Sequence, residues 1–214
     1  GNDRLTGAAG NDSLLGGLGD DTYVFGLASA AEADTVTEAT NAGTDTLSFS
    51  TLTTDVILNL GSTAIQTVHT NRTFEKAIGG SGNDTLTGNS LANTLTGNAG
   101  HDILVGNAGN DQLLGGVGRD ILIGGTGLDV LNGGADDDIL IAGRTTSDAL
   151  FSNLNDLRTE WISANLYATR ITNLRAGVGV SGASLKAKVN VFNDTAAIDT
   201  LTGGGGTDWY FRAL

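Results

Sequence analysis

Residues 97–125 read GNAGHDILVGNAGNDQLLGGVGRDILIGG, in which one nine-residue phrase of glycines, an Asp and a Leu is repeated three times. The same phrase fills seven uninterrupted frames from Gly79 to Ile141, and position 8 of every frame is Leu. Position 6 holds Asp84, Asn93, Asp102, Asp111, Asp120, Asp129 and Asp138. A fixed period of this kind indicates a solenoid built from one repeated turn and one repeated strand.

The frame itself predicts an all-β fold, a parallel β-roll. Glycines at positions 1, 2 and 4 allow the positive φ angles of a tight turn, and the three residues after Asp can form a short strand whose middle side chain points inward. Two frames make one coil, and coils stack as parallel strands about 4.8 Å apart, so each Asp lies over the Asp eighteen residues away. We expect one column of Asp84, Asp102, Asp120 and Asp138 and a second of Asn93, Asp111 and Asp129.

The stacked carboxylates require a cation. Unpaired neighbours at this spacing repel by roughly 3 kcal/mol at an effective dielectric constant near 20. Carboxylate and carbonyl oxygens, with no His or Cys at the repeated positions, favour Ca²⁺ over zinc or a transition metal. The alternative is a metal-free glycine-rich solenoid.

These frames resemble the G-G-x-G-x-D-x-U-x repeat of RTX (hemolysin-type) calcium-binding proteins. In that family each ion lies between turns of adjacent coils, held by Asp carboxylates and by backbone carbonyls at positions 1 and 3 of one turn and 2 and 4 of the next. The resemblance implies several Ca²⁺ ions and assigns a set of metal ligands in the frames and in shorter pieces of the repeat. These residues are Asp3, Asp12, Asp21, Gly79, Gly80, Ser81, Gly82, Asp84, Gly97, Asn98, Ala99, Gly100, Asp102, Gly106, Ala108, Asp111, Gly115, Gly116, Val117, Gly118, Asp120, Gly125, Gly127, Asp129, Gly134, Asp136, Asp138 and Asp208.

Two frames depart from the pattern. GNSLANTLT has Leu91 at a Gly position and neutral Asn93 at the Asp position, so we expect weak or no ion binding between this turn and the Asp111 turn. GGADDDILI has Asp136 at a Gly position, but Asp tolerates the left-handed region better than most residues, so we keep that site.

The period divides the chain into four regions. Residues 1–25 form a short first roll block, and 26–78 form a strand-rich insert that extends or flanks the roll, with alternating apolar residues in DVILNL. Residues 79–141 form the main roll of seven nonapeptides. Residues 142–214 form a helix and a C-terminal cap, in which KVNVF reads as a strand and DTLTGGGGTDWYF restores a full frame with Asp208 in the Asp position.

The helix is predicted from apolar residues spaced by three and four, with a cap at Thr146 or Ser147, a break near Asn165 and Gly177 after its end. They are Leu150, Leu154, Leu157, Trp161, Ala164, Ala168 and Ile171. One sheet of the roll presents an outward apolar patch of Ile103, Val105, Ile121, Ile123, Ile139 and Ile141. We expect the amphipathic helix to cover this patch. A solvated helix and an intermolecular docking surface are the alternatives.

Composition limits the function. The net charge is −13 and there are no Cys residues, which argues against nucleic-acid binding and excludes disulfides. No stretch approaches the ~20 apolar residues of a membrane span, so we expect no membrane insertion. GNDRLTG begins within a repeat phrase and is no signal peptide, so we expect a piece of a longer protein. His69 and His101 lie outside any HExxH motif, His101 is expected to be solvent-exposed, and GxSxG does not occur, so we do not expect an enzyme.

The tail, from DDDILIAG to DTLTGGGGTDWYFRAL, resembles the C-terminal end of large bacterial secreted or surface proteins with RTX repeats. The resemblance implies an uncleaved type I secretion signal, for which residues 208–211 are suitable, although these aromatic residues could equally seal the roll. We therefore expect a calcium-dependent folding, secretion and capping module of a large extracellular protein. Its expected partners are calcium, the type I secretion machinery, and other copies of itself or cell-surface components. The alternatives are the secretion tail of a protease or lipase and a self-assembling surface-layer or filament subunit.

Overall fold

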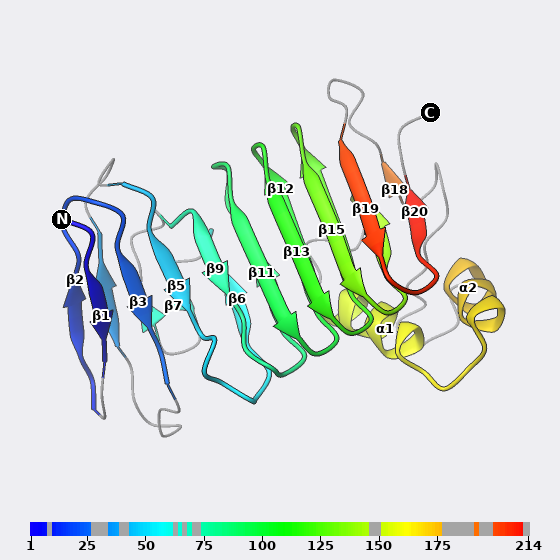
Figure 1. Cartoon of the computed structure of the whole chain (residues 1–214), viewed down its shortest axis with the longest axis horizontal. Helices are drawn as coiled ribbons and strands as arrows, with labels where there is room; N and C mark the ends of the chain where they lie inside the picture. Colours follow the sequence, from blue (N-terminus) through cyan, green and yellow to red (C-terminus); the bar gives the residue numbers. More distant parts are fainter. Residues whose placement is uncertain are drawn as a thin grey trace.

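The computed structural model describes residues 1–7, 10–26, 34–38, 43–61, 64–65, 68–69, 74–145, 151–176, 191–192 and 199–211. The strands lie side by side along the long axis of the molecule, with the N-terminus at one end and the helices at the other (Figure 1). The predicted parallel β-roll with an added helical segment is confirmed, because the strands of the main sheets pair in parallel.

One face of the roll is an eight-stranded sheet, here called the long sheet, which runs from the N-terminal end to the C-terminal cap. In spatial order its strands are β1 (Arg4–Thr6), β3 (Thr22–Val24), β5 (Thr46–Ser48), β9 (Lys76–Ile78), β11 (Thr94–Ala99), β13 (Gln112–Val117), β15 (Val130–Ala135) and β19 (Thr200–Gly204). Strands β5 and β9 lie in the glycine-poor stretch 26–78, so the long sheet continues through that stretch without interruption.

The opposite face is a six-stranded sheet, here called the short sheet. Its strands are β6 (Ile57–Asn59), β10 (Thr85–Thr87), β12 (Ile103–Ala108), β14 (Ile121–Thr126), β16 (Ile139–Ile141) and β20 (Trp209–Phe211). At the N-terminal end this face is a separate sheet of β2 (Ser13–Leu15), β4 (Thr35–Thr37), β8 (Val68–His69) and β7 (Ala64–Ile65). A small antiparallel pair, β17 (Arg144–Thr145) with β18 (Val191–Phe192), includes the strand predicted from KVNVF.

The core lies between the two faces and consists of the position 8 residues. Paired strands are offset by eighteen residues, as in Leu104 opposite Leu122, so like residues stack on like. The position 8 leucines, Leu86, Leu95, Leu104, Leu113, Leu122, Leu131 and Leu140, are all fully buried. Burial of each such side chain typically contributes about 1.5–3 kcal/mol, so this row is a major source of stability.

The φ angles of the turns account for the glycines at positions 2 and 4 of the frame but not for the glycine at position 1. From Asn98 to Asp136, positions 2 and 4 of the frames have positive φ, as at Gly116 (121°) and Gly118 (125°), and Asp136 adopts the expected left-handed conformation with φ 74°. The position 1 glycines of the described main-roll turns do not have positive φ, contrary to expectation. Position 1 must be Gly for a steric reason: a Cβ atom on Gly97 would collide with the Asp102 carboxylate.

The expected helix is a hairpin of α1 (Phe151–Trp161) and α2 (Tyr167–Ala176), and the break falls near Asn165 as predicted. The prediction that it covers the outer face of the short sheet is confirmed. The six outward Ile and Val side chains are buried in one cluster with Leu154, Leu157, Trp161 and Leu174. Ala164 and Ala168 are exposed rather than part of the buried stripe, because the chain turns between the helices. Leu150, Thr146, Ser147 and Gly177 lie outside the described residues.

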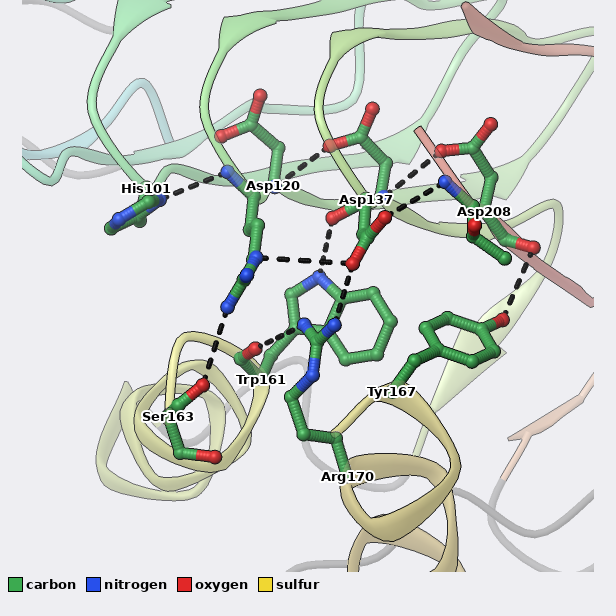
Figure 2. A network of polar contacts seen from close by, with 11 residues as sticks. His101, Asp120, Asp137, Trp161, Ser163, Tyr167, Arg170 and Asp208 are labelled. Carbon is green, nitrogen blue, oxygen red and sulfur yellow. Dashed lines mark hydrogen bonds and ion pairs between the residues drawn. The ribbon is translucent and has the colours of Figure 1, made fainter. Parts of the chain in front are cut away.

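Polar contacts fix the hairpin to the turns of the roll (Figure 2). Trp161 Nε1 donates to the Asp137 carbonyl oxygen at 2.9 Å, and Arg170 Nη2 lies 2.5 Å from the Asp137 carboxylate. Partial burial opposes ionisation of Asp137, but the hydrogen bond and charge of Arg170 outweigh it and lower the pKa of that carboxyl. Arg119 donates to the Ser163 carbonyl oxygen at 3.2 Å. Neither helix in the described part of the chain is long and apolar enough to cross a membrane.

Candidate metal centres

The residues that precede the strands form two columns at the edges where the turns meet the strands, and all but Asn93 and Val56 are acidic. The long-sheet column consists of Asp3, Asp21, Asp45, Glu75, Asn93, Asp111, Asp129 and Asp199, the residues that precede its strands. The short-sheet column consists of Val56, Asp84, Asp102, Asp120, Asp138 and Asp208. A third pair, Asp12 and Asp34, precedes β2 and β4. The structure thus brings the predicted Asp84, Asp102, Asp120, Asp138 and Asp208 into one row.

Each column carboxylate is tied to the coil before it by one of its oxygens. The backbone N–H of Asp84 donates to Asp102 Oδ1 at 2.7 Å, and that of Asp102 donates to Asp120 Oδ1 at 2.8 Å. Asp138 and Asp208 continue the same pattern. One oxygen of each carboxylate therefore sets the register of the stack, and the second is left for another partner.

In four of the column residues that second oxygen is buried and accepts no hydrogen bond from the described part of the chain. Within the described residues, Oδ2 of Asp102, Asp111, Asp120 and Asp138 accepts no hydrogen bond, although these side chains are at most 1% exposed. A buried carboxylate without a partner is strongly unfavourable unless a cation or a proton neutralises it. These atoms therefore mark the places where a cation would bind.

The pKa values of these carboxyls lead to the same conclusion. Burial, with repulsion from column neighbours, raises the pKa of Asp102 and of Asp138 to about 8. Burial likewise raises the pKa of Asp111 and of Asp120 to about 7. Near neutral pH the carboxyls therefore hold protons unless a metal ion takes the place of the protons.

Position 1 of each turn shows that further oxygens converge on the same place. A Cβ atom on Gly97 would collide with Asp102 Oδ2 and lie 2.7 Å from the Gly115 carbonyl oxygen. At Gly115 the corresponding atoms are Asp120 Oδ2 and the Gly133 carbonyl oxygen, at 2.5 Å. The ligands offered are oxygens, the type that Ca²⁺ prefers, and the turns can supply several of them. The residues therefore fit calcium.

The turn backbones of the predicted sites are also in register. Gly100 N–H donates to the Val117 carbonyl oxygen at 3.0 Å, and Ala99 N–H donates to the Gly80 carbonyl oxygen at 3.4 Å. A carbonyl oxygen has two lone pairs, so one hydrogen bond leaves room for a metal bond. Asn98 Nδ2 donates to the Gly79 carbonyl oxygen at 2.8 Å and ties these turns further.

The side-chain amide of Asn93 is hydrogen-bonded through both its oxygen and its nitrogen. Its Oδ1 accepts the Asn89 N–H at 2.8 Å, and its Nδ2 lies 3.4 Å from the Phe74 carbonyl oxygen and 3.3 Å from the Glu75 carbonyl oxygen. The amide N–H groups thus donate to carbonyl oxygens that would otherwise be available to an ion. These contacts lie on the side of Glu75, so weak or absent ion binding between the Asn93 and Asp111 turns stays a prediction.

Sequence reasoning missed several members of the columns. Asp199 lies nine residues before Asp208 and could have been found from the period. Asp45 lies in GTDTLSF, which keeps half of the frame, so it too could have been found, whereas Asp34 and Glu75 follow stretches without the glycine phrase and no local signal identifies them. His101 is half-buried rather than solvent-exposed: its Nδ1 accepts the Arg119 N–H at 2.9 Å, and burial lowers its pKa.

The fold and the columns define a calcium-binding parallel β-roll. A family model for the RTX calcium-binding nonapeptide repeat matches the chain in four copies, at residues 1–27, 78–113, 114–145 and 188–212. These matches cover more than half of the 214 residues, and the chain belongs to this family. RTX nonapeptide repeats bind calcium, and the number of repeats is consistent with several ions. No curated protein matches the chain.

Proposed function

We propose that this chain is a calcium-dependent folding, secretion and end-capping module of a large extracellular protein. The observation that carries the proposal is the set of buried carboxylate oxygens in the two columns, those of Asp102, Asp111, Asp120 and Asp138, which accept no hydrogen bond from the described residues. Folding without calcium must bury these groups either protonated or in mutual repulsion, so calcium binding and folding are coupled. Proteins with RTX repeats are typically secreted, which is consistent with this role.

The coupling gives export a direction. At the low calcium concentration of the cytosol the acidic repeats stay unfolded, a state that can pass through a narrow channel. Extracellular calcium-binding modules typically have dissociation constants of about 10⁻⁴–10⁻³ M, so external calcium would fill the columns. Each folded coil offers its carboxylates and its strand edges to the coil that folds after it. Folding outside the cell therefore prevents the chain from sliding back through the channel.

Capping is supported by the way the last residues rejoin the roll. Strand β19 pairs with β15 and strand β20 pairs with β16, so each sheet receives one final strand. Trp209 packs against the buried cluster beneath the helices, and the Arg175 guanidinium lies 5.4 Å from its ring centroid. The same residues could carry the secretion signal before folding, since a chain in transit is not yet part of a sheet.

Circular dichroism of the chain in chelator, calcium and magnesium tests the proposal. We expect a largely unfolded spectrum in chelator and a cooperative gain of β structure with calcium but not with magnesium, which demands a tighter octahedral site. Asp120→Asn should raise the calcium concentration at the midpoint, whereas Glu160→Gln, the same kind of change on α1, should not. An unchanged β spectrum after thorough chelation would contradict the proposal.

Solution size in calcium separates this function from self-assembly. A folding module should remain monomeric when calcium is added, whereas a surface-layer or filament subunit should form larger species that chelator disperses. Light scattering across a calcium titration measures this.

A further inference from the structure

The N-terminal coils hold a cluster of three buried carboxylates that the nonapeptide pattern does not describe. Asp21, Glu38 and Asp45 each offer one oxygen, and these oxygens lie within 4.8 Å of one another. Their side chains are 1%, 3% and 1% exposed. Asp21 and Asp45 belong to the long-sheet column, but Glu38 follows β4 on the opposite face.

Glu38 reaches this place because of where the strand pairing puts it. Leu15 on β2 pairs with Thr37 on β4, so Glu38 occupies the position of its coil that Gly16 occupies in the coil before. This is position 1 of the turn, where a Cβ atom points toward the Asp carboxylate. A glutamate there therefore directs its side chain into the space that the regular frames leave empty.

The spacing between Glu38 and Asp45 differs from that of the nonapeptide. Seven residue positions separate Glu38 from Asp45, whereas five separate Gly97 from Asp102. Glu38 therefore supplies a carboxylate at the position where a regular frame has Gly, and it does so before a longer segment than the repeat contains.

Tyr23 provides a second departure from the repeat. It stands at the inward position 8 that is Leu throughout the main roll, and its hydroxyl donates a short hydrogen bond to Glu38 Oε1. Burial, together with the Glu38 carboxylate, raises the pKa of the Tyr23 hydroxyl, which therefore keeps its proton and acts as a donor. Tyr23 thus holds Glu38 in place beside Asp21.

An orphaned oxygen points into the cluster. Asp21 Oδ1 accepts the Asp3 N–H at 2.7 Å, but Asp21 Oδ2 has no hydrogen-bond partner within the described residues. A Cβ atom placed on Gly16 would meet Asp21 Oδ2, the Tyr23 hydroxyl and Glu38 Oε1 together. Three oxygens from two parts of the chain, the start of β3 and the end of β4, thus surround one small space that exists because residue 16 is Gly.

Electrostatics favours a cation in that space. The three carboxylate oxygens lie within 4.8 Å of one another, so each of the three pairs is repulsive when the groups are ionised.

We propose that Asp21, Glu38 and Asp45 form a side-chain cation site for calcium, which shares Asp21 and Asp45 with the long-sheet column and differs from the nonapeptide sites by the carboxylate of Glu38. Affinity for calcium rises with the number of ligand charges, so this site fills at lower calcium than the regular columns. Because Glu38 follows a strand of one face and Asp21 and Asp45 precede strands of the other, the ion joins both faces of the N-terminal coils.

Native mass spectrometry and calcium titration of the full chain test this site. Glu38→Gln removes one charged ligand with almost no change in shape, and should lose one ion, the first to bind, while the remaining ions bind as before. Gly16→Ala keeps every ligand but places a methyl group in the space, and should lose the same ion. Glu160→Gln on α1 is the matched control and should keep all ions.

Terbium luminescence identifies the first site in the unaltered chain. Tyr23 lies in the cluster, whereas Trp161 and Trp209 lie toward the opposite end of the roll, so the first equivalent of Tb³⁺ should show a tyrosine excitation spectrum. Tyr23→Phe should abolish most of that emission.

Two results would overturn the proposal. One is an unchanged number and affinity of ions in Glu38→Gln. The other is a tryptophan excitation spectrum for the first terbium ion, which remains decisive even if the variants fail to fold. Loss of only the later ions, as in Asp120→Asn, reports on the regular columns instead and leaves the two proposals separately testable.

Discussion

The helical cover over the short sheet makes Ile121 a sensitive position. Ile121 is fully buried in the cluster with Leu157 and Trp161, so Ile121→Ala should lower the free energy of unfolding of the calcium-saturated protein by about 2–5 kcal/mol. Val130 has the same frame position on the opposite sheet but is 43% exposed, so Val130→Ala should cost less than about 1 kcal/mol. Strands β14 and β15 each pair with a neighbouring strand on both sides. The difference between the two losses in the free energy of unfolding therefore measures the contribution of the helices that cover Ile121.

The magnitude has two parts. Transferring the side chain atoms of Ile121 back to water accounts for part of the loss, since full burial of an Ile is worth about 1.5–3 kcal/mol. The cavity left beneath the helices adds about 24 cal/mol for each Å³ that the structure cannot close. At Val130 water fills the space, so no cavity term arises.

Urea unfolding in saturating calcium measures both variants, followed by the fluorescence of buried Trp161 and by far-UV circular dichroism. Leu157→Ala tests the same contact from the helix side, and the double variant with Ile121→Ala should show a coupling of about 0.5–3 kcal/mol. Equal costs for Ile121→Ala and Val130→Ala, or strict additivity with Leu157→Ala, would refute the reasoning.

Calcium affinity should fall as pH is lowered from about 8.5 to 6, because Asp102 and Asp138, whose pKa burial raises to about 8, then bind protons that calcium must displace. Calorimetry in buffers of different ionisation enthalpy measures the released protons, and an absence of proton release at pH 7 would contradict this. In chelator the raised pKa makes the folded form bind more protons than the unfolded chain between about pH 4 and 8, so residual structure should decrease as pH rises through that window. Asn93→Asp should add a calcium ion in native mass spectrometry and strengthen calcium-induced folding; an unchanged ion count would show that carbonyl geometry limits that turn. Arg170→Gln should leave the ion count unchanged but loosen the hairpin, seen as faster amide exchange in α1 and α2, because Asp137 loses its 2.5 Å partner.

The sequence by itself determined the main roll, its two columns and its core. Two nine-residue frames make one coil, so residues that pair between adjacent coils are always eighteen positions apart. Each frame therefore lies beside a frame of the same pattern, and Asp stacks on Asp and Leu on Leu. The amphipathic pattern of the tail and the apolar outer face of the short sheet were also readable. Both the helices and the outer face of the short sheet have an apolar surface that must be buried, and the helices follow the sheet directly in the chain.

Only the tertiary structure decided what the irregular coils do. Asp21 donates its N–H to Asp45 across 24 residues, Asp45 to Glu75 across 30, and Asp129 to Asp199 across 70. These separations follow no period, so the half-frame GTDTLSF indicates Asp45 but not its neighbours in the column, and the Glu38 cluster could not be predicted from the sequence. The physical reason is that hydrogen bonding between coils fixes which residues lie side by side, whereas the length of the chain between the coils can vary.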